Sequence, residues 1–536
     1  MHKSVFSKTE IKLRYDNLWK IIFVFSLPTV FVMAISASYP ILDKLIALTF
    51  VTPNVYHYQP YLDWYRENIN NNNGVLSYQG AKIFVNLATN FSGQIYNLLL
   101  AFAVLIAIGT SITFAIKYGQ NNKQQTQSLA GNALTITILF SIVAAFFVFC
   151  LVFPKWDNIM IFIQLSKKGS WITKDLTWRY VFPMLLASPL MFISYLLLTL
   201  LRTDGKGRIV VYIMVGSILV NVCFSIILVK YANLLLEGTM FGTIISWVFI
   251  IVVSLICIYR NKDSYLRFHW KDLFYFRKST VKEIFRLGFS SFLNNLGIVL
   301  VSILSSTIMS YLPGQFDEKQ RSGLSAFQLF NSAMTPWVVF FTAIALGFAQ
   351  GIKSIIGYNY GAKKYLRMYQ TCWYGLIIIG SWLFFVLLLF IGLGPQLLMT
   401  FAFPSSSLVD QYRWTSVLML MSYPCAAISF MGVTLFQGMN NARKAALCSS
   451  FRTLIVLPVL MLAGAFIVRG LSDGTPKNNI YYFIMIGFND LISGIIVGII
   501  LYSFWYKHRH SIFNEVSKMD QEYLRIKTRH NKNKIQ

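Results

Sequence analysis

Residues 371–401 read TCWYGLIIIGSWLFFVLLLFIGLGPQLLMTF and include no charged side chain. Such a stretch is long enough to cross the roughly 30 Å hydrocarbon core of a bilayer as an α-helix. An irregular chain or an open sheet could not satisfy its backbone hydrogen bonds in that environment. The stretch therefore predicts a transmembrane helix.

Comparable stretches recur along the whole chain. Hydrophobic residues make up 56% of the 536 residues and charged residues only 12%, whereas a soluble domain carries about twice that share of charge. We therefore predict an all-α polytopic membrane protein with twelve transmembrane helices. The predicted spans are 18–51, 86–117, 129–154, 177–201, 207–231, 236–259, 284–311, 325–352, 371–401, 411–437, 444–469 and 480–506.

Two features stand out near the N-terminus. The first span is longer than a perpendicular crossing needs and contains Pro28 and Pro40, so we expect it to bend or tilt. The outer connection that follows, 52–85, is long and has asparagine at every position from Asn70 to Asn73. A cap over the outer opening and a disordered insertion both remain open for it.

The net charge of +27 reflects membrane topology better than nucleic-acid binding, because the basic residues form no single patch. They lie mostly in the two tails and in connections on the side of those tails. The positive-inside bias predicts that both termini are cytoplasmic, in a multi-pass protein of the plasma membrane. The most basic connection, 260–283, contains Arg260, Lys262, Arg267, Lys271, Arg277, Lys278 and Lys282.

Several classes of protein lack support in the sequence. No glycine loop followed by Lys-Ser/Thr suggests ATP-driven pumping, and no group of His, Asp or Cys suggests a membrane-embedded enzyme. We expect no enzymatic activity and no cofactor. The cysteines lie within or at the ends of apolar stretches without a CxxC pair, which favours packing over disulfides or metal binding. They are Cys150, Cys223, Cys257, Cys372, Cys425 and Cys448.

The connection 260–283 divides the chain into halves that look like repeats. Gly109 and Gly119 in the first half have the same spacing as Gly351 and Gly361 in the second. Six-span halves of equal orientation imply a pseudo-two-fold axis along the membrane normal, and carriers of this kind bind substrate between their halves. Gene duplication without a transport role is the alternative. The predicted units are a tail at 1–17, lobes at 18–259 and 284–506 around the connection, and a tail at 507–536.

Only two acidic residues lie deep within the predicted spans, Asp43 and Asp490. An ionisable side chain in a span is costly and prompts a functional hypothesis. Because burial disfavours a charged carboxylate, Asp43 could take up a proton on one side and release it on the other. It could also bind Na⁺ through oxygen. An ion pair with Lys44, or with a lysine of the outer loops, is the alternative.

Asp490 lies about 15 Å from the outer end of the twelfth span by helical rise. The neighbouring Asn489 favours a structural hydrogen bond for it. Arg452 lies nearer the inner end of the eleventh span, so the rise argues against direct pairing with Asp490 and favours a side chain that reaches toward the cytoplasm. Aromatic residues, at 16%, could line a cavity for lipophilic cations, although packing is the commoner use.

Taken together, these features resemble the multidrug and toxin extrusion (MATE) family of secondary transporters over nearly all of residues 18–506. Four stretches carry the resemblance: Leu27-Pro28 with the segment of Asp43; Gly109 through Gly119 with Asn121, Asn122 and Lys123; Leu201-Arg202-Thr203-Asp204-Gly205 with Asn221; and residues 351–363, which contain Tyr358-Asn359-Tyr360-Gly361-Ala362 and end in Lys363.

The resemblance implies export of organic cations and other drugs in exchange for H⁺ or Na⁺. It makes Asp43 the coupling residue, with Asn221, Ser225 and Thr243 around it, and Asp43, Asn221 and Thr243 would also form a Na⁺ site. Where the family has a second Asp on the fifth helix, this chain has Ser225. A serine hydroxyl can ligate a cation but cannot hold a proton, so the difference favours H⁺ coupling through Asp43.

We therefore expect a monomeric antiporter that works by alternating access. Its partners would be small lipophilic or cationic drugs and the lipid bilayer, without nucleic acid. A flippase for lipids or lipid-linked oligosaccharides, from the same superfamily, is the alternative. The candidate substrate-binding residues are Tyr39, Asn294, Asn489 and Asp490.

Overall fold

The computed structural model describes residues 18–68, 78–119, 123–152, 170–260, 266–268, 278–311, 326–361, 364–401, 406–439, 441–470 and 480–535. Helices dominate these residues, and no strand occurs among them. Ten helices in this part of the chain are long and apolar enough to span a membrane, and there are up to twelve spans if two bent helix pairs each count as one. The predicted all-α polytopic fold is confirmed.

The first half of the chain ends at the basic connection. Its elements are α2 (Leu18–Ile46), the π-helical turn η1 (Ala47–Val51), α3 (Thr52–His57), α4 (Gln59–Asn68), α5 (Tyr78–Gly119), α6 (Lys123–Val152), α8 (Ser170–Leu186), α9 (Ser188–Thr203), α10 (Gly207–Lys230) and α11 (Leu236–Arg260).

The second half follows the same pattern. Its elements are α12 (Lys278–Tyr311), α13 (Ala326–Gly361), α14 (Tyr365–Met399), α15 (Ser406–Met419), the 3-10 turn η4 (Tyr423–Cys425), α16 (Ala426–Gly438), α17 (Ala442–Ser450), the π-helical turn η5 (Phe451–Val456), α18 (Leu457–Gly470), α19 (Ile480–Gly487) and α20 (Asn489–Ile535).

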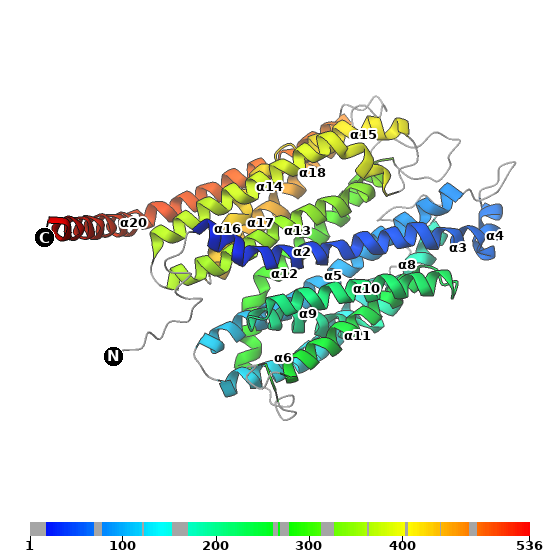
Figure 1. Ribbon diagram of the computed structural model, residues 1–536. Helices are drawn as coiled ribbons and strands as arrows, with labels where there is room; N and C mark the ends of the chain where they lie inside the picture. The colour runs from blue at the N-terminus through cyan, green and yellow to red at the C-terminus, as the bar shows by residue number, and fades with distance from the viewer. Residues whose placement is uncertain are drawn as a thin grey trace.

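The two halves form two helix bundles that lie side by side (Figure 1). Across their boundary, α2 of the first half packs on α13 of the second, and α5 packs on α12. We call the end from which α20 projects the tail end, and the opposite end, with α3 and α4, the loop end (Figure 1). The fold therefore has two lobes with a long shared boundary.

Proline residues explain the bend between α8 and α9. The chain bends by 62° between α8 and α9, with Pro183 inside α8 and Pro189 in the first turn of α9. Each proline removes a backbone donor and crowds the preceding turn. In contrast, α2 continues as one helix through Pro28 and Pro40, and a π-helical turn follows it.

Two predicted boundaries differ from the structure. Most of the expected outer loop 52–85 is helical, because α3, α4 and the start of α5 occupy it. Asn54 anchors α3, since its Nδ2 donates to Val229 O at 2.9 Å and to Leu234 O at 3.1 Å. At the other terminus, α20 continues to Ile535 instead of ending near residue 506.

Some expectations fall outside the described residues. They concern the tail 1–17, Asn70 to Asn73, Asn121, Asn122, Ala362, Lys363 and most of the connection 260–283.

Glycines allow the two halves to approach closely. A methyl group on Gly109 of α5 would lie 2.0 Å from Ile284 O of α12, and one on Gly288 of α12 would lie 1.9 Å from Leu105 O of α5. The backbones of these helices are therefore in direct contact, as small residues permit within membranes.

We call each line of contact between helices of the two halves a seam. The second seam, between α2 and α13, repeats the arrangement of α5 and α12. A methyl group on Gly351 would lie 2.4 Å from Ser26 Cα, and one on Gly347 would lie 2.5 Å from Val30 Cα. Thr29 Oγ1 also donates to Gly347 O at 2.8 Å. The contact of Gly351 with Ser26 corresponds to that of Gly109 with Ile284, because in each seam a glycine of one helix meets the backbone of the helix from the other half.

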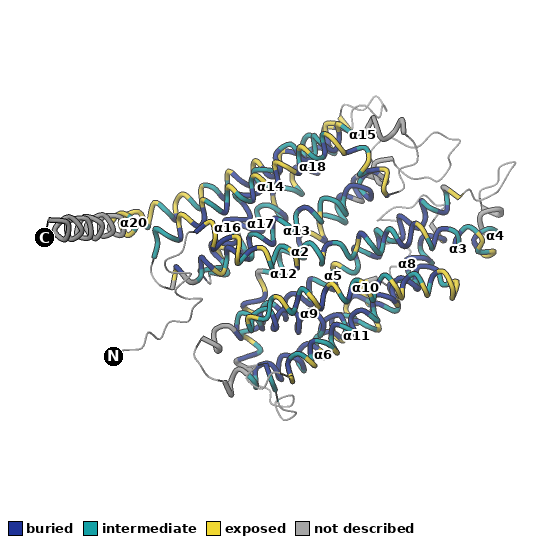
Figure 2. Tube along the Cα trace, in the orientation of Figure 1, coloured by how far each residue is buried: buried dark blue, intermediate teal, exposed yellow. Residues whose placement is uncertain are grey.

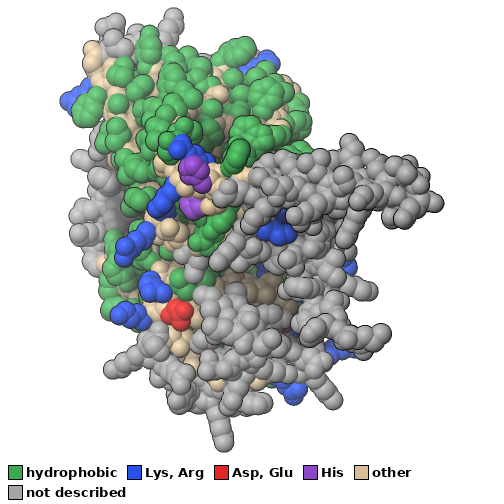
Figure 3. All heavy atoms as spheres, turned by 90° about the vertical axis from the view of Figure 1, so that its left-hand side faces the viewer, with side chains coloured by type: hydrophobic (Ala, Val, Ile, Leu, Met, Phe, Trp, Pro, Cys, Tyr) green, Lys and Arg blue, Asp and Glu red, His purple; other side chains and the backbone are tan. Residues whose placement is uncertain are grey.

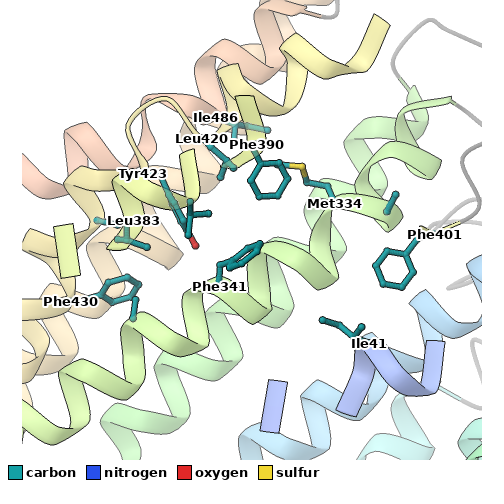
Figure 4. Packing of buried hydrophobic residues seen from close by; sticks show 14 of the residues in the cluster. Ile41, Met334, Phe341, Leu383, Phe390, Phe401, Leu420, Tyr423, Phe430 and Ile486 are labelled. Atoms are coloured by element: carbon teal, nitrogen blue, oxygen red, sulfur yellow. The ribbon is translucent and has the colours of Figure 1, made fainter. Parts of the chain in front are cut away.

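Burial follows the same organisation. Exposed positions lie mostly on the outward faces of the bundles and buried ones inside them (Figure 2). Large exposed side chains such as Phe146, Leu186 and Phe466 are apolar, as expected for surfaces in contact with lipid. Figure 4 shows aromatic side chains filling the interior of the second half, with Ile41 of α2 near Phe401 at its edge.

Candidate functional site

Asp43 lies on the face of α2 that packs against α10 and α11. Thr243 Oγ1 of α11 donates to Asp43 Oδ2 at 3.2 Å, and Asn221 Nδ2 of α10 donates to Thr243 Oγ1 at 3.0 Å. Asn221 is fully buried and Thr243 is 3% exposed. Three of the residues assigned to cation coupling are thus brought together from three helices.

The local sequence explains why α10 and α11 present polar atoms here. Ser217, Asn221 and Ser225 recur every four residues and form one buried stripe on α10, as the helical period requires. Gly242 lets α11 approach this stripe, because a methyl group there would lie 2.1 Å from Ser225 Oγ.

Two oxygen atoms in this cluster lack a partner. Asp43 Oδ1 and Asn221 Oδ1 are buried and accept no hydrogen bond from the part of the chain that is described. An unsatisfied buried acceptor costs about 1–3 kcal/mol. With Thr243 Oγ1, these atoms supply the oxygen ligands that Na⁺ prefers, and the carboxylate can instead accept a proton.

Three tyrosines lie in the neighbourhood of the Asp43 carboxylate. Tyr39 Oη donates to Ser217 Oγ at 2.5 Å, and Tyr96 and Tyr180 lie close enough to interact electrostatically with Asp43. Only Tyr39 was a sequence candidate. The other two come from α5 and α8, far away along the chain, and no spacing pattern could have connected them with Asp43.

Ser225 is one helical turn from Asn221, but its hydroxyl is directed elsewhere. Ser225 Oγ donates to Thr239 O at 3.4 Å and makes no hydrogen bond to Asp43. The residue that stands where the family has a second acid is therefore used for packing between α10 and α11.

Lys44 does not pair with Asp43, so the ion pair expected between these two neighbours is wrong. Lys44 Nζ donates to Ser332 O of α13 at 2.6 Å and lies 5.1 Å from the centre of the Phe401 ring. Asn86 of α5 donates to Ser332 Oγ at 3.1 Å and to Phe401 O at 3.2 Å. These contacts join the two halves at the loop end.

The prediction against pairing of Arg452 with Asp490 is wrong. Arg452 Nε lies 2.7 Å from Asp490 Oδ1, and its guanidinium stacks 4.6 Å from the centre of the Phe430 ring instead of reaching the tail end. The estimate from helical rise ignored the π-helical turn η5, the break at Phe488 between α19 and α20, and the length of the arginine side chain.

The remaining candidates belong to contacts within the second half. Asn489 Nδ2 donates to Asp490 Oδ1 at 3.3 Å, which agrees with the expected polar packing contact. Asn294 Oδ1 accepts from Ser449 Oγ at 2.6 Å and so links α12 to α17. Among the described residues, no hydrogen bond or ion pair joins Asn294, Asn489 or Asp490 to Asp43, so the structure does not assemble all candidates into one site.

Comparison with known proteins adds independent information. The MatE family model matches residues 88–227 and 291–462. The probable multidrug resistance protein YoeA of Bacillus subtilis is 23% identical over 299 residues, which are 55% of this chain and 59% of that protein. The uncharacterized protein MG447 of Mycoplasma genitalium is 22% identical over 507 residues, 90% of each chain.

Solved structures share the fold. An outward-facing multidrug resistance MATE family transporter of the MOP superfamily aligns with a TM-score of 0.70 and 16% identity, over 95% of this chain and 99% of its own. A MOP superfamily transporter from Pyrococcus furiosus aligns with a TM-score of 0.69 and 17% identity, over the same shares of the two chains.

Proposed function

This chain belongs to the MATE family of membrane transporters, and on that premise we propose that it is a secondary active multidrug efflux antiporter. It exports lipophilic, cationic compounds by alternating access, in exchange for H⁺ or Na⁺. The proposal includes a location in the plasma membrane, cytoplasmic termini and a monomeric state. The chain matches 59% of the length of the B. subtilis relative named for multidrug resistance.

The observation that carries the proposal is the cluster of Asp43, Thr243 and Asn221. Two of its buried oxygens, one from the Asp43 carboxylate and one from the Asn221 amide, accept no hydrogen bond from the described residues. The cluster lies where three helices of one lobe meet. A cation bound here neutralises Asp43, and its loss restores the negative charge. The charge of the site therefore changes each time a proton or Na⁺ binds or leaves.

Competition between the drug and the coupling ion for the negative charge of Asp43 would couple export of the drug to entry of the ion. A cationic drug is attracted to the Asp43 carboxylate and to the faces of nearby tyrosines such as Tyr39 and Tyr96. A proton or Na⁺ that enters from the other side removes the negative charge and weakens the hold on the drug. One ion then moves inward as one drug molecule leaves.

The single carboxylate favours H⁺ over Na⁺ in this proposal. Ser225 brings no charge, and its hydroxyl donates to Thr239 O. A Na⁺ ion would have to shed water for one carboxylate and neutral oxygens, whereas a proton needs only the carboxylate.

The flippase alternative draws support from one observation. Lys44 is 5% exposed at the boundary between the lobes, with a carbonyl and an aromatic ring as its contacts. A buried cation there would suit the anionic headgroup of a lipid. Transport of a fluorescent anionic lipid, without transport of a lipophilic cation, would favour this function.

The decisive experiment measures export of a fluorescent lipophilic cation from proteoliposomes under imposed pH and Na⁺ gradients. Asp43→Asn should abolish gradient-driven export, whereas the matched change of exposed Asp63 on α4, Asp63→Asn, should not. Equal gradient-driven rates for wild type and Asp43→Asn would refute the coupling role. Export that requires ATP would refute the antiporter.

A further inference from the structure

Two basic side chains from different lobes lie on either side of Gln350 near the tail end of the boundary. Arg202 lies at the end of α9, and its Nη1 donates across the boundary to Gln350 Oε1 of α13 at 3.3 Å. Lys353 follows Gln350 by about one helical turn on α13. It is close enough to Arg202 for their charges to interact, and both side chains are partly buried.

No acidic side chain compensates this pair of charges among the residues that the structure describes. The acid nearest in sequence, Asp204, is bound by Lys206, with 2.8 Å between Lys206 Nζ and Asp204 Oδ2. Arg202 Nε is buried and has no acceptor among the residues that the structure describes. Two like charges away from bulk water repel each other and need a counter-charge to persist at low cost.

The pair lies at a junction of three helices. Gln350, which accepts from Arg202, also directs its Nε2 to Met33 Sδ of α2 at 3.6 Å. The next residue, Gly351, contacts Ser26 of α2 directly. An anion held here would therefore touch the point where α2, α9 and α13 bring the two lobes together.

The surroundings at this end are basic as well. Figure 3 looks onto the tail end and shows Lys and Arg side chains across its described part, with little acidic surface in view. Such a face attracts anions toward the boundary.

We propose that Arg202 and Lys353 bind a phosphate-type oxyanion between the lobes, supplied by a phospholipid headgroup or by free phosphate. Arginine presents a planar fork of donors that fits phosphate oxygens, and lysine adds a compact positive charge. The bound anion offsets the repulsion between the lobes and stabilises their contact at the tail end. This site is separate from the Asp43 cluster and does not depend on the ion-coupling proposal.

Thermal unfolding of the full-length purified protein tests the site. In neutral detergent at constant ionic strength, replacing chloride by inorganic phosphate should raise the Tm of the wild type by about 2–4 °C. Nanodiscs of phosphatidylcholine with and without phosphatidylglycerol form the second arm. A rise only in the second arm identifies a lipid headgroup as the ligand, and a rise in both arms identifies a site open to either source.

Variants separate this site from general charge effects. Arg202→Gln and Lys353→Gln should lose the rise in Tm, whereas Arg208→Gln and Lys20→Gln, which change exposed basic residues, should keep it. Lys353→Glu should supply the missing counter-charge itself, so its Tm without anion should exceed that of Lys353→Gln and should not respond to phosphate or phosphatidylglycerol.

The proposal fails if the wild type responds in neither arm. It also fails if wild type, Arg202→Gln and Lys353→Gln respond equally. If one glutamine variant does not fold, the other provides the test, and Arg202→Lys should retain only part of the response because it keeps the charge but loses the planar fork of donors.

Discussion

Asp43 and Lys44 are adjacent in α2 but bind opposite lobes. Asp43 accepts a hydrogen bond from Thr243 of the first lobe at 3.2 Å, and Lys44 donates to Ser332 O of the second lobe at 2.6 Å. Consecutive helical residues point about 100° apart, so one helix can contact both partners at the same height. A change in the charge of Asp43 therefore occurs directly beside a contact that holds the lobes together.

Removing the Thr243 hydroxyl should make Asp43 hold a proton more tightly without unfolding the protein, because the lost hydrogen bond stabilises the charged carboxylate. Thr243→Val has nearly the same shape but loses the hydrogen bond to Asp43, and a bond to a charged group contributes about 1.5–3 kcal/mol. We expect the ion concentration that gives half-maximal export to shift by roughly 10- to 100-fold. Thr243→Ser should restore the value. An unchanged half-maximal concentration in Thr243→Val would contradict the assignment.

Ser225 should contribute little to coupling. Because its hydroxyl donates to Thr239 O and not to Asp43, Ser225→Ala should export at about the wild-type rate under either gradient. Ser225→Asp should not create a Na⁺ site of ordinary strength, since Gly242 packs against this side chain and overpacking costs about 1–3 kcal/mol. Strong loss of coupling in Ser225→Ala would show that the hydroxyl joins the site in another conformation.

Lys44 should hold the loop end of the boundary closed. Lys44→Met keeps the length of the side chain but removes its donor to Ser332 O, so the loop end should open more often. Labelling of a cysteine introduced by Ser332→Cys, with a hydrophilic maleimide in a background free of native cysteines, should become several-fold faster. Lys44→Arg should leave the labelling rate near that of wild type. If Lys44→Met is labelled no faster than wild type, Lys44 does not hold the loop end closed.

Small residues at the seams should be required for lobe contact. Gly109→Ala places a methyl group 2.0 Å from Ile284 O, and Gly351→Ala places one 2.4 Å from Ser26 Cα. Each should lower the Tm, although alanine is favoured over glycine in a helix by about 1 kcal/mol. Gly93→Ala, also on α5 with nothing within 4 Å, should be neutral or stabilising. An equal decrease in the Tm of Gly93→Ala would show that the effect does not come from the close contact of helices at the seams.

The ion pair of the second lobe should behave as one unit. Arg452→Met or Asp490→Asn alone leaves a buried charge or polar group without its partner, and such a loss costs about 3–5 kcal/mol. The double variant should cost clearly less than the two single changes together. Additive losses in a double-mutant cycle of thermal stability would mean that the pair contributes little, despite its 2.7 Å separation.

The sequence alone determined the membrane-spanning helices, their repeat and the family resemblance. Those features depend on composition and on spacing along one chain, as in the apolar stretch 371–401 and the equal spacing of Gly109 with Gly119 and Gly351 with Gly361. It also singled out Asp43, because a carboxylate in an apolar stretch is visible without coordinates. The period of four that relates Ser217, Asn221 and Ser225 is also present in the sequence, but the structure showed that these residues form one buried face of α10.

Only the tertiary structure decided which side chains meet. It directed Lys44 away from Asp43, paired Arg452 with Asp490, and brought Arg202 to Gln350 from the other lobe. The reason is physical: hydrogen bonds and ion pairs depend on distances of about 3 Å. Helix bends, π-helical turns and side-chain length move atoms by more than that, and none of them can be read from the number of residues between two positions.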